Sequence, residues 1–476
     1  MELTDLPDEP PRLLKLIPDW LRVRRVMYLG LYVMLAMVTQ YMVNAADTGM
    51  VGRLDDPQLA TASQAALGLG MPLFWAVGGF FSAISYGTQA MTARRYAEGD
   101  ERRAGQVLFN SLLTALVFGV IGSLVGWFLS PYAVDYLAEA SPEQQALGTE
   151  YVQIRAVGIA GMVVTFSYKA FFDGIGRTYV HLVAALVMNV FNIGLNYLMI
   201  FGSPSLGIEP MELAGAAWAS TISTFLGLAI MAIISMRPRY RLRFRFYRAT
   251  GLDFRVMGNI VKLMLPSGSA TVILMAGFLL FMKFVGQIDA AAGGGNTYSA
   301  ATKAVMDTGA FCFMPLLALG TATATAVSQS LGARKPNLAA SYGWETVRLM
   351  MWVMVLVGIV FWVWPEEILA ALWAPNDLAV AQAGAQPLRL VGTSLPMMAV
   401  GLILSQALYG AGANTYVMVA EGLLHFALFV PLAWLLGPVL HYGIDGVWVA
   451  AIVYVNGLGV VMGGKFLTKG WRSIRL

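Results

Sequence analysis

Apolar stretches of about 20 residues follow one another along almost the whole chain, separated by short polar segments. A helix of about 20 apolar residues spans the roughly 30 Å hydrocarbon core of a bilayer. The pattern predicts twelve such helices, over residues 27–52, 68–93, 106–130, 152–173, 179–201, 212–236, 261–286, 300–330, 346–364, 384–409, 416–437 and 445–466. We therefore expect an all-α polytopic membrane protein with 12 transmembrane helices.

The apolar pattern contains an internal repeat with an offset of 234 residues. Val51, Gly52, Leu54 and Asp55 recur as Val285, Gly286, Ile288 and Asp289, and GIGRTYV (174–180) is echoed by GAGANTYV (410–417). Two halves with six helices each have the same topology and are related by an axis along the membrane normal, an arrangement typical of secondary transporters. The predicted divisions are a tail over 1–25, an N-terminal lobe over 26–236, a basic linker over 237–258, a C-terminal lobe over 259–466 and a tail over 467–476.

Composition narrows the class of function. Hydrophobic residues make up 58% of the chain and charged residues 12%, about half the charged fraction of a soluble domain. One cysteine, Cys312, excludes an intrachain disulfide framework and a cysteine-based metal site, and three histidines without an HExxH spacing argue against a metalloenzyme. The start of the chain is charged and broken by prolines, so we expect no cleavable signal peptide. We expect neither an enzyme nor a nucleic-acid-binding protein.

The charged residues predict the orientation in the membrane. With the N-terminus inside, the basic segments, including the linker sequence MRPRYRLRFRFYR, all fall on the same side, and acidic residues prevail on the other. The positive-inside rule then predicts a multi-pass protein of the plasma (inner) membrane with both termini cytoplasmic. The basic linker is interpreted as an inside connection with additional contact to anionic membrane lipids.

An ionisable residue within a membrane span is costly and is a functional candidate by default. Asp47 lies in the first predicted helix, whereas its repeat counterpart is Phe281. In the fifth helix Asn189, Asn192 and Asn196 are spaced by three and four residues and form one polar stripe. A carboxylate facing these amides suits a proton or a sodium ion; the alternative is that the asparagines only hold helices together.

The second half carries charges elsewhere. Lys283 lies in the seventh helix, Lys303 and Asp307 are four residues apart in the eighth, and Glu421 and His425 are four apart in the eleventh. Two residues four apart share a helix face, so the two members of each pair are expected to offset the cost of burying one another. Because imidazole titrates near neutral pH, Glu421 and His425 suit a proton relay. A purely structural pair is the alternative.

The motifs resemble the multidrug and toxic compound extrusion (MATE) family of cation-coupled antiporters. ADTGMVGRLDDPQLATAS is similar to its first helix and following loop, and NIGLN and LAGAAWASTIS to its fifth and sixth helices. FMPLLALGTATATAVSQSLGARKPNLAA is similar to its eighth helix and next loop, and GAGANTYV to the loop between its helices ten and eleven. These matches cover nearly the whole chain in order.

The resemblance implies two six-helix bundles in a V, related by pseudo-twofold symmetry, that export organic cations or other amphipathic compounds in exchange for H⁺ or Na⁺. The family's coupling site is carried over onto Asp47, Asn192, Asn196 and Ser220, with Na⁺ at the first three as the alternative to a proton. A small-molecule substrate, membrane lipids and a monomeric state are expected, without a cofactor.

Departures from the family pattern bear on the coupling ion. Asn196 stands where one branch of the family has a second aspartate, and Ile273–Met275 and Met398 are apolar where the NorM-like branch has acidic residues. Asp307 or Glu421 would have to replace the missing acids in the second bundle. Protons are therefore the favoured coupling ion. The alternative functions are a flippase of lipid-linked sugars from the same superfamily and a membrane-embedded enzyme, for which no catalytic cluster is visible.

Overall fold

The computed structural model describes residues 3–12, 15–137, 142–247, 251–373 and 378–476. These residues form helices joined by loops, with one isolated β-bridge between Ser203 and Ile208. Within the described part of the chain, 12 helices are long and apolar enough to cross a membrane. The predicted all-α membrane fold is confirmed.

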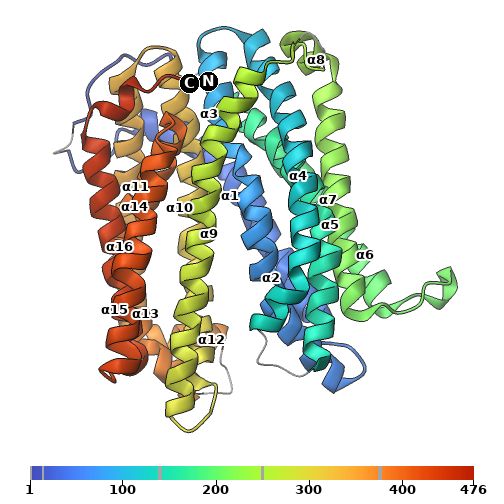
Figure 1. Cartoon of the computed structure of the whole chain (residues 1–476). Helices are drawn as coiled ribbons and strands as arrows, with labels where there is room; N and C mark the ends of the chain where they lie inside the picture. Colours follow the sequence, from blue (N-terminus) through green and yellow to red (C-terminus); the bar gives the residue numbers. More distant parts are fainter. Residues whose placement is uncertain (1–2, 13–14, 138–141, 248–250, 374–377) are drawn as a thin grey trace. The chain divides into compact units, whose positions relative to one another are not determined.

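The chain separates into two compact units, which Figure 1 shows as sets of helices running up and down. We call Tyr32–Val272 with Leu476 the N-terminal unit, and Met1–Leu31 with Ile273–Arg475 the C-terminal unit. The boundaries fall within α1 (Trp20–Val51) and α9 (Phe254–Ala291). The predicted lobes are divided at the 237–258 linker instead, and that division stays a prediction.

The remaining elements follow in chain order. In the N-terminal unit they are α2 (Pro57–Ser82), α3 (Ile84–Ala97), α4 (Glu101–Leu137), α5 (Pro142–Gly174), α6 (Tyr179–Phe201), the 3₁₀ turn η1 (Pro204–Leu206), α7 (Glu212–Met236) and α8 (Pro238–Phe244). In the C-terminal unit they are α10 (Thr297–Gly332), α11 (Pro336–Val363), α12 (Pro365–Leu372), α13 (Leu378–Ala411), α14 (Asn414–Leu423), the π-helical η3 (Leu424–Phe429), α15 (Val430–Trp434), the π-helical η4 (Leu435–Val439), α16 (Gly443–Leu467) and the 3₁₀ turn η5 (Gly470–Ser473).

Each unit is organised around its fourth membrane helix. In the N-terminal unit α5 packs against α2, α3, α4 and α7, and in the C-terminal unit α13 packs against α10, α11 and α16. Small residues allow close approach of helices. A Cβ atom on Gly410 of α13 would collide with the main-chain oxygen of Ala324 on α10. The equivalent place of α5 and α13 agrees with the internal repeat.

The eleventh membrane span departs from regular α-helix. It runs over Asn414–Val439 and contains the two π-helical segments η3 and η4. Pro431 follows η3 closely and Pro438 lies within η4. A proline has no N–H to donate, and its ring pushes against the carbonyl four residues earlier, so the turn widens. The Leu440 N–H accordingly donates to Leu435 O, five residues back, at 2.9 Å.

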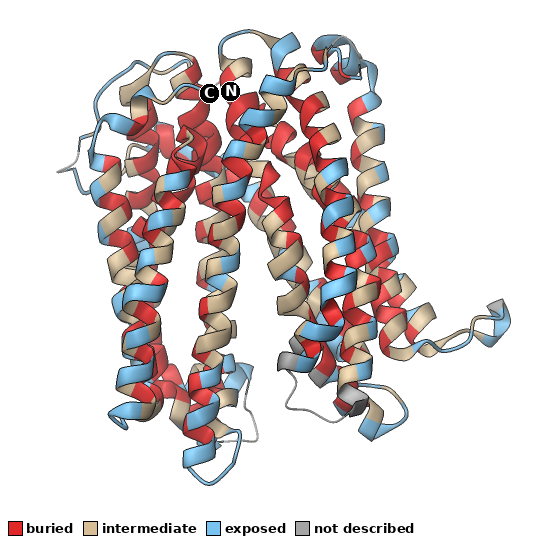
Figure 2. Cartoon of the chain, in the orientation of Figure 1, coloured by how far each residue is buried: buried red, intermediate tan, exposed pale blue. Residues whose placement is uncertain are grey.

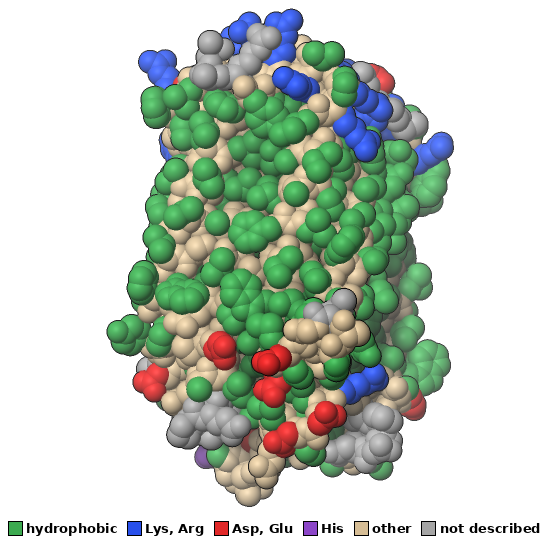
Figure 3. Space-filling view, turned by 90° about the vertical axis from the view of Figure 1, so that its right-hand side faces the viewer, with side chains coloured by type: hydrophobic (Ala, Val, Ile, Leu, Met, Phe, Trp, Pro, Cys, Tyr) green, Lys and Arg blue, Asp and Glu red, His purple; other side chains and the backbone are tan. Residues whose placement is uncertain are grey.

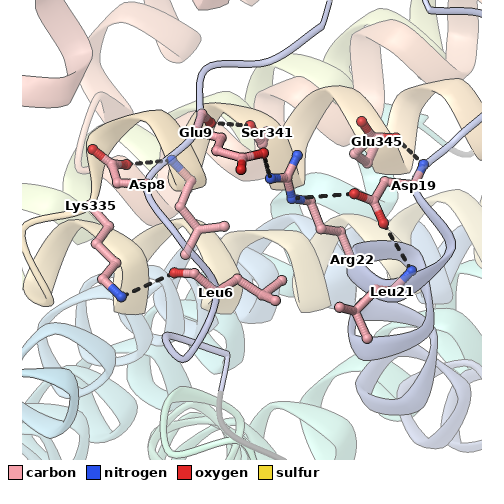
Figure 4. A network of polar contacts seen from close by, with 10 residues as sticks. Leu6, Asp8, Glu9, Asp19, Leu21, Arg22, Lys335, Ser341 and Glu345 are labelled. Atoms are coloured by element: carbon pink, nitrogen blue, oxygen red, sulfur yellow. Dashed lines mark hydrogen bonds and ion pairs between the residues drawn. The ribbon is translucent and has the colours of Figure 1, made fainter.

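Residues 3–12, which precede α1, form an N-terminal arm along α11, shown in Figure 4. Leu3 is buried, and its main-chain oxygen accepts a hydrogen bond from the Tyr342 hydroxyl at 2.7 Å. Lys335 Nζ donates to Leu6 O at 3.0 Å. Asp8 accepts from the main-chain N–H of Leu338 at 2.8 Å. Because Leu338 lies in the first turn of α11, Asp8 caps that helix from a distant part of the sequence.

The surface of the helices is suited to lipid. Along α4 the side chains of Leu116, Val120 and Leu124 are exposed at four-residue spacing. Figure 2 shows that buried positions alternate with exposed ones along the helices of both units. In Figure 3 hydrophobic side chains cover the middle of one face, with most of the Lys and Arg at one end and most of the Asp and Glu at the other. This distribution is that of a multi-pass membrane protein.

Candidate functional site

Four polar side chains of the N-terminal unit form a closed ring of hydrogen bonds inside the membrane helices. Asn196 Nδ2 donates to Asp47 Oδ1 at 2.5 Å and to Asn192 Oδ1 at 3.1 Å. Asn192 Nδ2 donates to Ser220 Oγ at 3.2 Å, and Ser220 Oγ donates to Asp47 Oδ2 at 3.3 Å. The structure therefore brings together the four residues onto which the resemblance to the MATE family carries the coupling site.

Helix geometry explains why these residues meet. Asn192 and Asn196 are one turn apart on α6, so their amides lie one above the other. Ser220 lies on α7, which packs directly against α6. Asp47 reaches the same place from the last turns of α1 and is only 6% exposed. A buried carboxylate requires such partners, since an unpaired charge away from water is strongly unfavourable.

The ring leaves some hydrogen-bonding capacity unused. Asn196 Oδ1 is buried and has no hydrogen-bond partner among the described residues. The same holds for both amide atoms of Asn189, one turn before Asn192 on α6, so the predicted stripe extends beyond the ring. Buried polar atoms of this kind are normally satisfied by an ion or a water molecule.

The donor set can be tested for a monovalent cation. Asp47 offers two carboxylate oxygens, Asn192 and Asn196 one amide oxygen each, and Ser220 a hydroxyl. Oxygen ligands suit hard cations. No group of three or more His, Cys, Asp or Glu that could hold a metal ion occurs in the described part of the chain. These oxygens fit Na⁺ in type, but in the ring each carboxylate oxygen already accepts a hydrogen bond.

Two of the C-terminal candidates form the expected ion pair. On α10, Lys303 Nζ lies 2.8 Å from Asp307 Oδ2. The Lys303 side chain is 73% exposed, so the pair lies at the surface of the protein. Lys283 on α9 is exposed as well. The structure does not bring these residues into a buried site comparable with the ring at Asp47.

The predicted side-chain pair between Glu421 and His425 does not form. His425 Nδ1 instead hydrogen-bonds with the main-chain oxygen of Glu421 at 3.0 Å. His425 lies in η3, and its ring centroid is 4.3 Å from that of Tyr454. A Cβ on Gly277 would lie 2.5 Å from the imidazole Cδ2, so the glycine makes room for the ring. The pairing prediction is wrong because the main chain and these neighbours determine where the imidazole lies.

The sequence interpretation missed Arg155. It lies on α5, inside the membrane span Gln145–Gly174, and interacts electrostatically with Asp47. Its signal was present, since it is a charged residue within the apolar stretch predicted over 152–173. An arginine in such a stretch is a functional candidate by the same argument that selected Asp47.

Comparison with known protein families shows to which family the chain belongs. The model of the MatE family matches two stretches of similar length, residues 33–198 and 266–435. The chain is a member of the MatE family. Asp47, Asn192 and Asn196 lie inside the first match, and Ser220 lies beyond it. The resemblance to MATE transporters is thereby confirmed, and the chain is a MATE transporter with one family match in each half.

Relatives of similar length are named multidrug resistance proteins. A "Probable multidrug resistance protein NorM" of Thermotoga maritima is 23% identical over 422 residues, covering 87% of this chain and 86% of the relative. The protein of the same name from Rhizobium meliloti is 26% identical over 464 residues, covering 95% and 93%. "Multidrug resistance protein PmpM" of Pseudomonas aeruginosa is 23% identical over 473 residues, covering 95% and 93%.

Solved structures show the same fold. A transporter of the MOP superfamily from Pyrococcus furiosus, described as having a binding pocket of reverse polarity, superimposes with a TM-score of 0.82 at 18% identity. The similarity covers 96% of this MATE transporter and 98% of that chain. An outward-facing multidrug resistance MATE transporter of the same superfamily gives a TM-score of 0.80 at 19% identity, covering 96% and 97%.

Proposed function

We propose that this MATE transporter exports organic cations and other amphipathic compounds from the cytoplasm in exchange for protons, and that Asp47 carries the exchanged proton. The observation that carries the proposal is the ring that surrounds this buried carboxylate. The names of the relatives, multidrug resistance proteins of similar length, support efflux of this kind.

The ring accommodates both protonation states of Asp47. When the carboxylate is charged, it accepts from Asn196 and from Ser220. When Oδ2 carries a proton, it donates to Ser220 Oγ instead, because a hydroxyl both donates and accepts. Ser220 Oγ then turns its own hydrogen away, and the amide donor of Asn196 stays in place. Each oxygen of the Asp47 carboxyl group thus keeps a hydrogen-bond partner in both protonation states.

The exchange releases enough free energy for efflux without ATP. For a neutral compound, one proton that enters across a potential of about 100 mV releases about 2.3 kcal/mol. Because about 1.4 kcal/mol corresponds to a tenfold concentration ratio, that proton sustains a gradient of roughly fortyfold. Exchange of one proton for one monovalent cation moves no net charge, so there a difference of about one pH unit sustains a gradient of about tenfold. We place the Lys- and Arg-rich end of the helices and both termini in the cytoplasm, and the protein in the inner membrane, by the positive-inside rule.

Transport in proteoliposomes tests the proposal. The purified full chain is reconstituted, and movement of the dye cation ethidium is followed under a pH gradient or a Na⁺ gradient imposed separately. We expect ethidium transport with the pH gradient alone, and its loss in Asp47→Asn. Asp55→Asn, the same change at an exposed residue beyond α1, is the matched control and should transport normally.

Three results would contradict the proposal. Wild-type transport rates in Asp47→Asn would show that the Asp47 carboxylate does not couple transport to the proton. Transport driven only by the Na⁺ gradient would show that the coupling ion is Na⁺ and not the proton. Failure to move ethidium and further organic cations under either gradient would argue against cation export and favour another cargo, such as a lipid-linked sugar.

A further inference from the structure

Arg155 lies at the same depth in the N-terminal unit as the ring around Asp47. Thr221 Oγ1 of α7 donates to Ile154 O of α5 at 3.1 Å, which places these two helices side by side at that level. Thr221 follows Ser220 of the ring, and Arg155 follows Ile154. The guanidinium and the Asp47 carboxylate interact electrostatically, although no ion pair within 4.0 Å joins them in the described part of the chain.

The guanidinium is held by neutral groups. Its central carbon lies 4.2 Å from the centroid of the Phe74 ring on α2, a cation–π geometry. Tyr151, one turn earlier on α5, interacts electrostatically with the Arg155 side chain, and its hydroxyl donates to Met71 Sδ at 3.4 Å. Arg155 Nε is buried without a hydrogen-bond partner among the described residues. The charge of Arg155 is therefore positioned without being neutralised in direct contact.

The other cation within the α5 span is neutralised locally. Lys169 Nζ lies 2.8 Å from Asp173 Oδ2, and the Asp173 side chain has no exposed surface. Around the Asp47 carboxylate, α5 contributes the charged Arg155 and the phenol of Tyr151, whereas α6 and α7 contribute neutral amides and a hydroxyl. Arg155 and Asp47 are thus the two opposite charges of this region.

The internal repeat provides a comparison within the same chain. IRAVG at 154–158 recurs as LRLVG at 388–392, with the offset of 234 that relates Asp47 to Phe281. Arg389 therefore occupies on α13 the place of Arg155 on α5, but the position of Asp47 is taken by a buried phenylalanine. Arg389 Nε donates to the main-chain oxygen of Trp362 at 3.4 Å. The arginine recurs in both halves, and the carboxylate occurs in one.

We propose that Arg155 is the resident countercharge of Asp47 and makes the ring a site for a proton rather than for a sodium ion. This inference rests on the proposed exchange at Asp47 and adds the residue that sets its ion preference. Arg155 acts on the ion through Asp47 and is a positioning residue, since it lies outside the ring.

The selectivity follows from how the two ions bind. A guanidinium remains charged at every physiological pH, so the charged Asp47 always has a cation nearby. Sodium binding depends on the field of the carboxylate and on several oxygens, and Arg155 offsets that field. A proton forms a covalent O–H bond with the carboxylate oxygen and needs no further ligand. The nearby cation therefore lowers the affinity of Asp47 for both ions. Proton binding keeps the energy of the covalent O–H bond, which sodium binding lacks.

Protonation of Asp47 can be measured directly by infrared difference spectroscopy on the full chain in lipid. A protonated carboxyl has a C=O stretching band, and the band that disappears in Asp47→Asn belongs to Asp47. The midpoint of this band against pH is compared between wild type, Arg155→Met, Arg155→Lys and Arg389→Met. Arg389→Met is the matched control, because it removes the same side chain from the equivalent place without an aspartate.

We expect the midpoint in Arg155→Met to rise by about one pH unit, as is typical for the loss of a nearby opposite charge. Arg155→Lys should lie close to wild type and Arg389→Met at the wild-type value. An unchanged midpoint in Arg155→Met would overturn the proposal. So would an equal rise in Arg389→Met, which would mean that both arginines act only on the scaffold.

A second measurement uses the wild type and remains available if Arg155→Met does not fold. The titration is repeated with Na⁺ in place of choline at constant ionic strength. We expect no change in the midpoint, whereas competition by Na⁺ that lowers it would contradict the assigned preference. Neither titration requires transport. If ethidium exchange fails while the midpoint still depends on Arg155, the proposed function is wrong and the countercharge assignment stands.

Discussion

Asn196 is the residue at which the ring can be changed with the sharpest consequence. Its Nδ2 atom lies 2.5 Å from Asp47 Oδ1. Asn196→Asp places a second carboxylate oxygen there without changing the shape of the side chain. Two unit charges at that distance repel by about 7 kcal/mol at an effective dielectric constant of about 20. Since one pH unit corresponds to about 1.4 kcal/mol, the repulsion equals about five pH units.

The two carboxyl groups of Asn196→Asp therefore share one proton throughout the neutral range. The shared proton replaces the amide donor to Asp47, and a flip of the Asn192 amide lets its Nδ2 donate to the new carboxyl group, so that all but one of the hydrogen bonds of the ring remain. The site keeps a net charge of −1, as in the wild type with Asp47 ionised. We expect this variant to fold and to transport ethidium under a pH gradient near neutral pH.

Asn196→Leu is the contrasting variant, because it removes the amide donor and adds none. Loss of a hydrogen bond to a buried charged group costs about 2 kcal/mol. We expect a lower melting temperature and loss of proton-driven transport. The assays are thermal unfolding of the purified protein and ethidium transport in proteoliposomes, with the infrared carboxyl band as a check for the extra proton in Asn196→Asp.

An Asn196→Asp variant that folds normally but is as inactive as Asn196→Leu would contradict the role of Asn196 as a hydrogen donor to Asp47. In that case the ring requires an amide at this position for a reason other than its donor. Wild-type stability and transport in Asn196→Leu would refute it as well, since Asp47 would then not depend on the ring.

Two further predictions concern stability in the C-terminal unit. Asp8→Ala removes the cap of α11 and should lower the free energy of unfolding by about 1 kcal/mol, which is measured as a lower melting temperature. Asp5 is an exposed acid of the same arm, and Asp5→Ala is the control that should leave the melting temperature unchanged. Gly277→Ala places a methyl group against the His425 ring and should lower the melting temperature, whereas Gly286→Ala on the same helix meets nothing within 4 Å and should not. Equal melting temperatures within either pair would contradict the corresponding contact.

The N-terminal unit shows how far side-chain periodicity leads. The spacing of Asn192 and Asn196 placed both amides on one face of a helix, and Asp47 was identified as the carboxylate able to face them. Their distances, and the place of Ser220 between them, depend on how α1, α6 and α7 pack. Arg155 is recognisable in the sequence as a charge in an apolar stretch, but nothing near it in the sequence indicates that its helix packs beside Asp47.

The C-terminal unit shows where periodicity misleads. Glu421 and His425 have the spacing of a helix pair, but the histidine contacts the main chain and Tyr454. Lys303 and Asp307 have the same spacing and do pair, at the surface. A shared helix face brings two side chains within reach, and their other neighbours decide whether they bond.

The sequence by itself determined the twelve membrane helices, the internal repeat and the carboxylate that the second half lacks. These follow from local quantities: the length of apolar stretches, the spacing of side chains and the cost of a charge in lipid. Only the tertiary structure decided that the polar ring closes, that Arg155 lies beside it, and that Asp8 of the N-terminal arm caps α11. Those contacts join residues that are up to 330 positions apart, and which distant surfaces meet depends on the packing of whole helices.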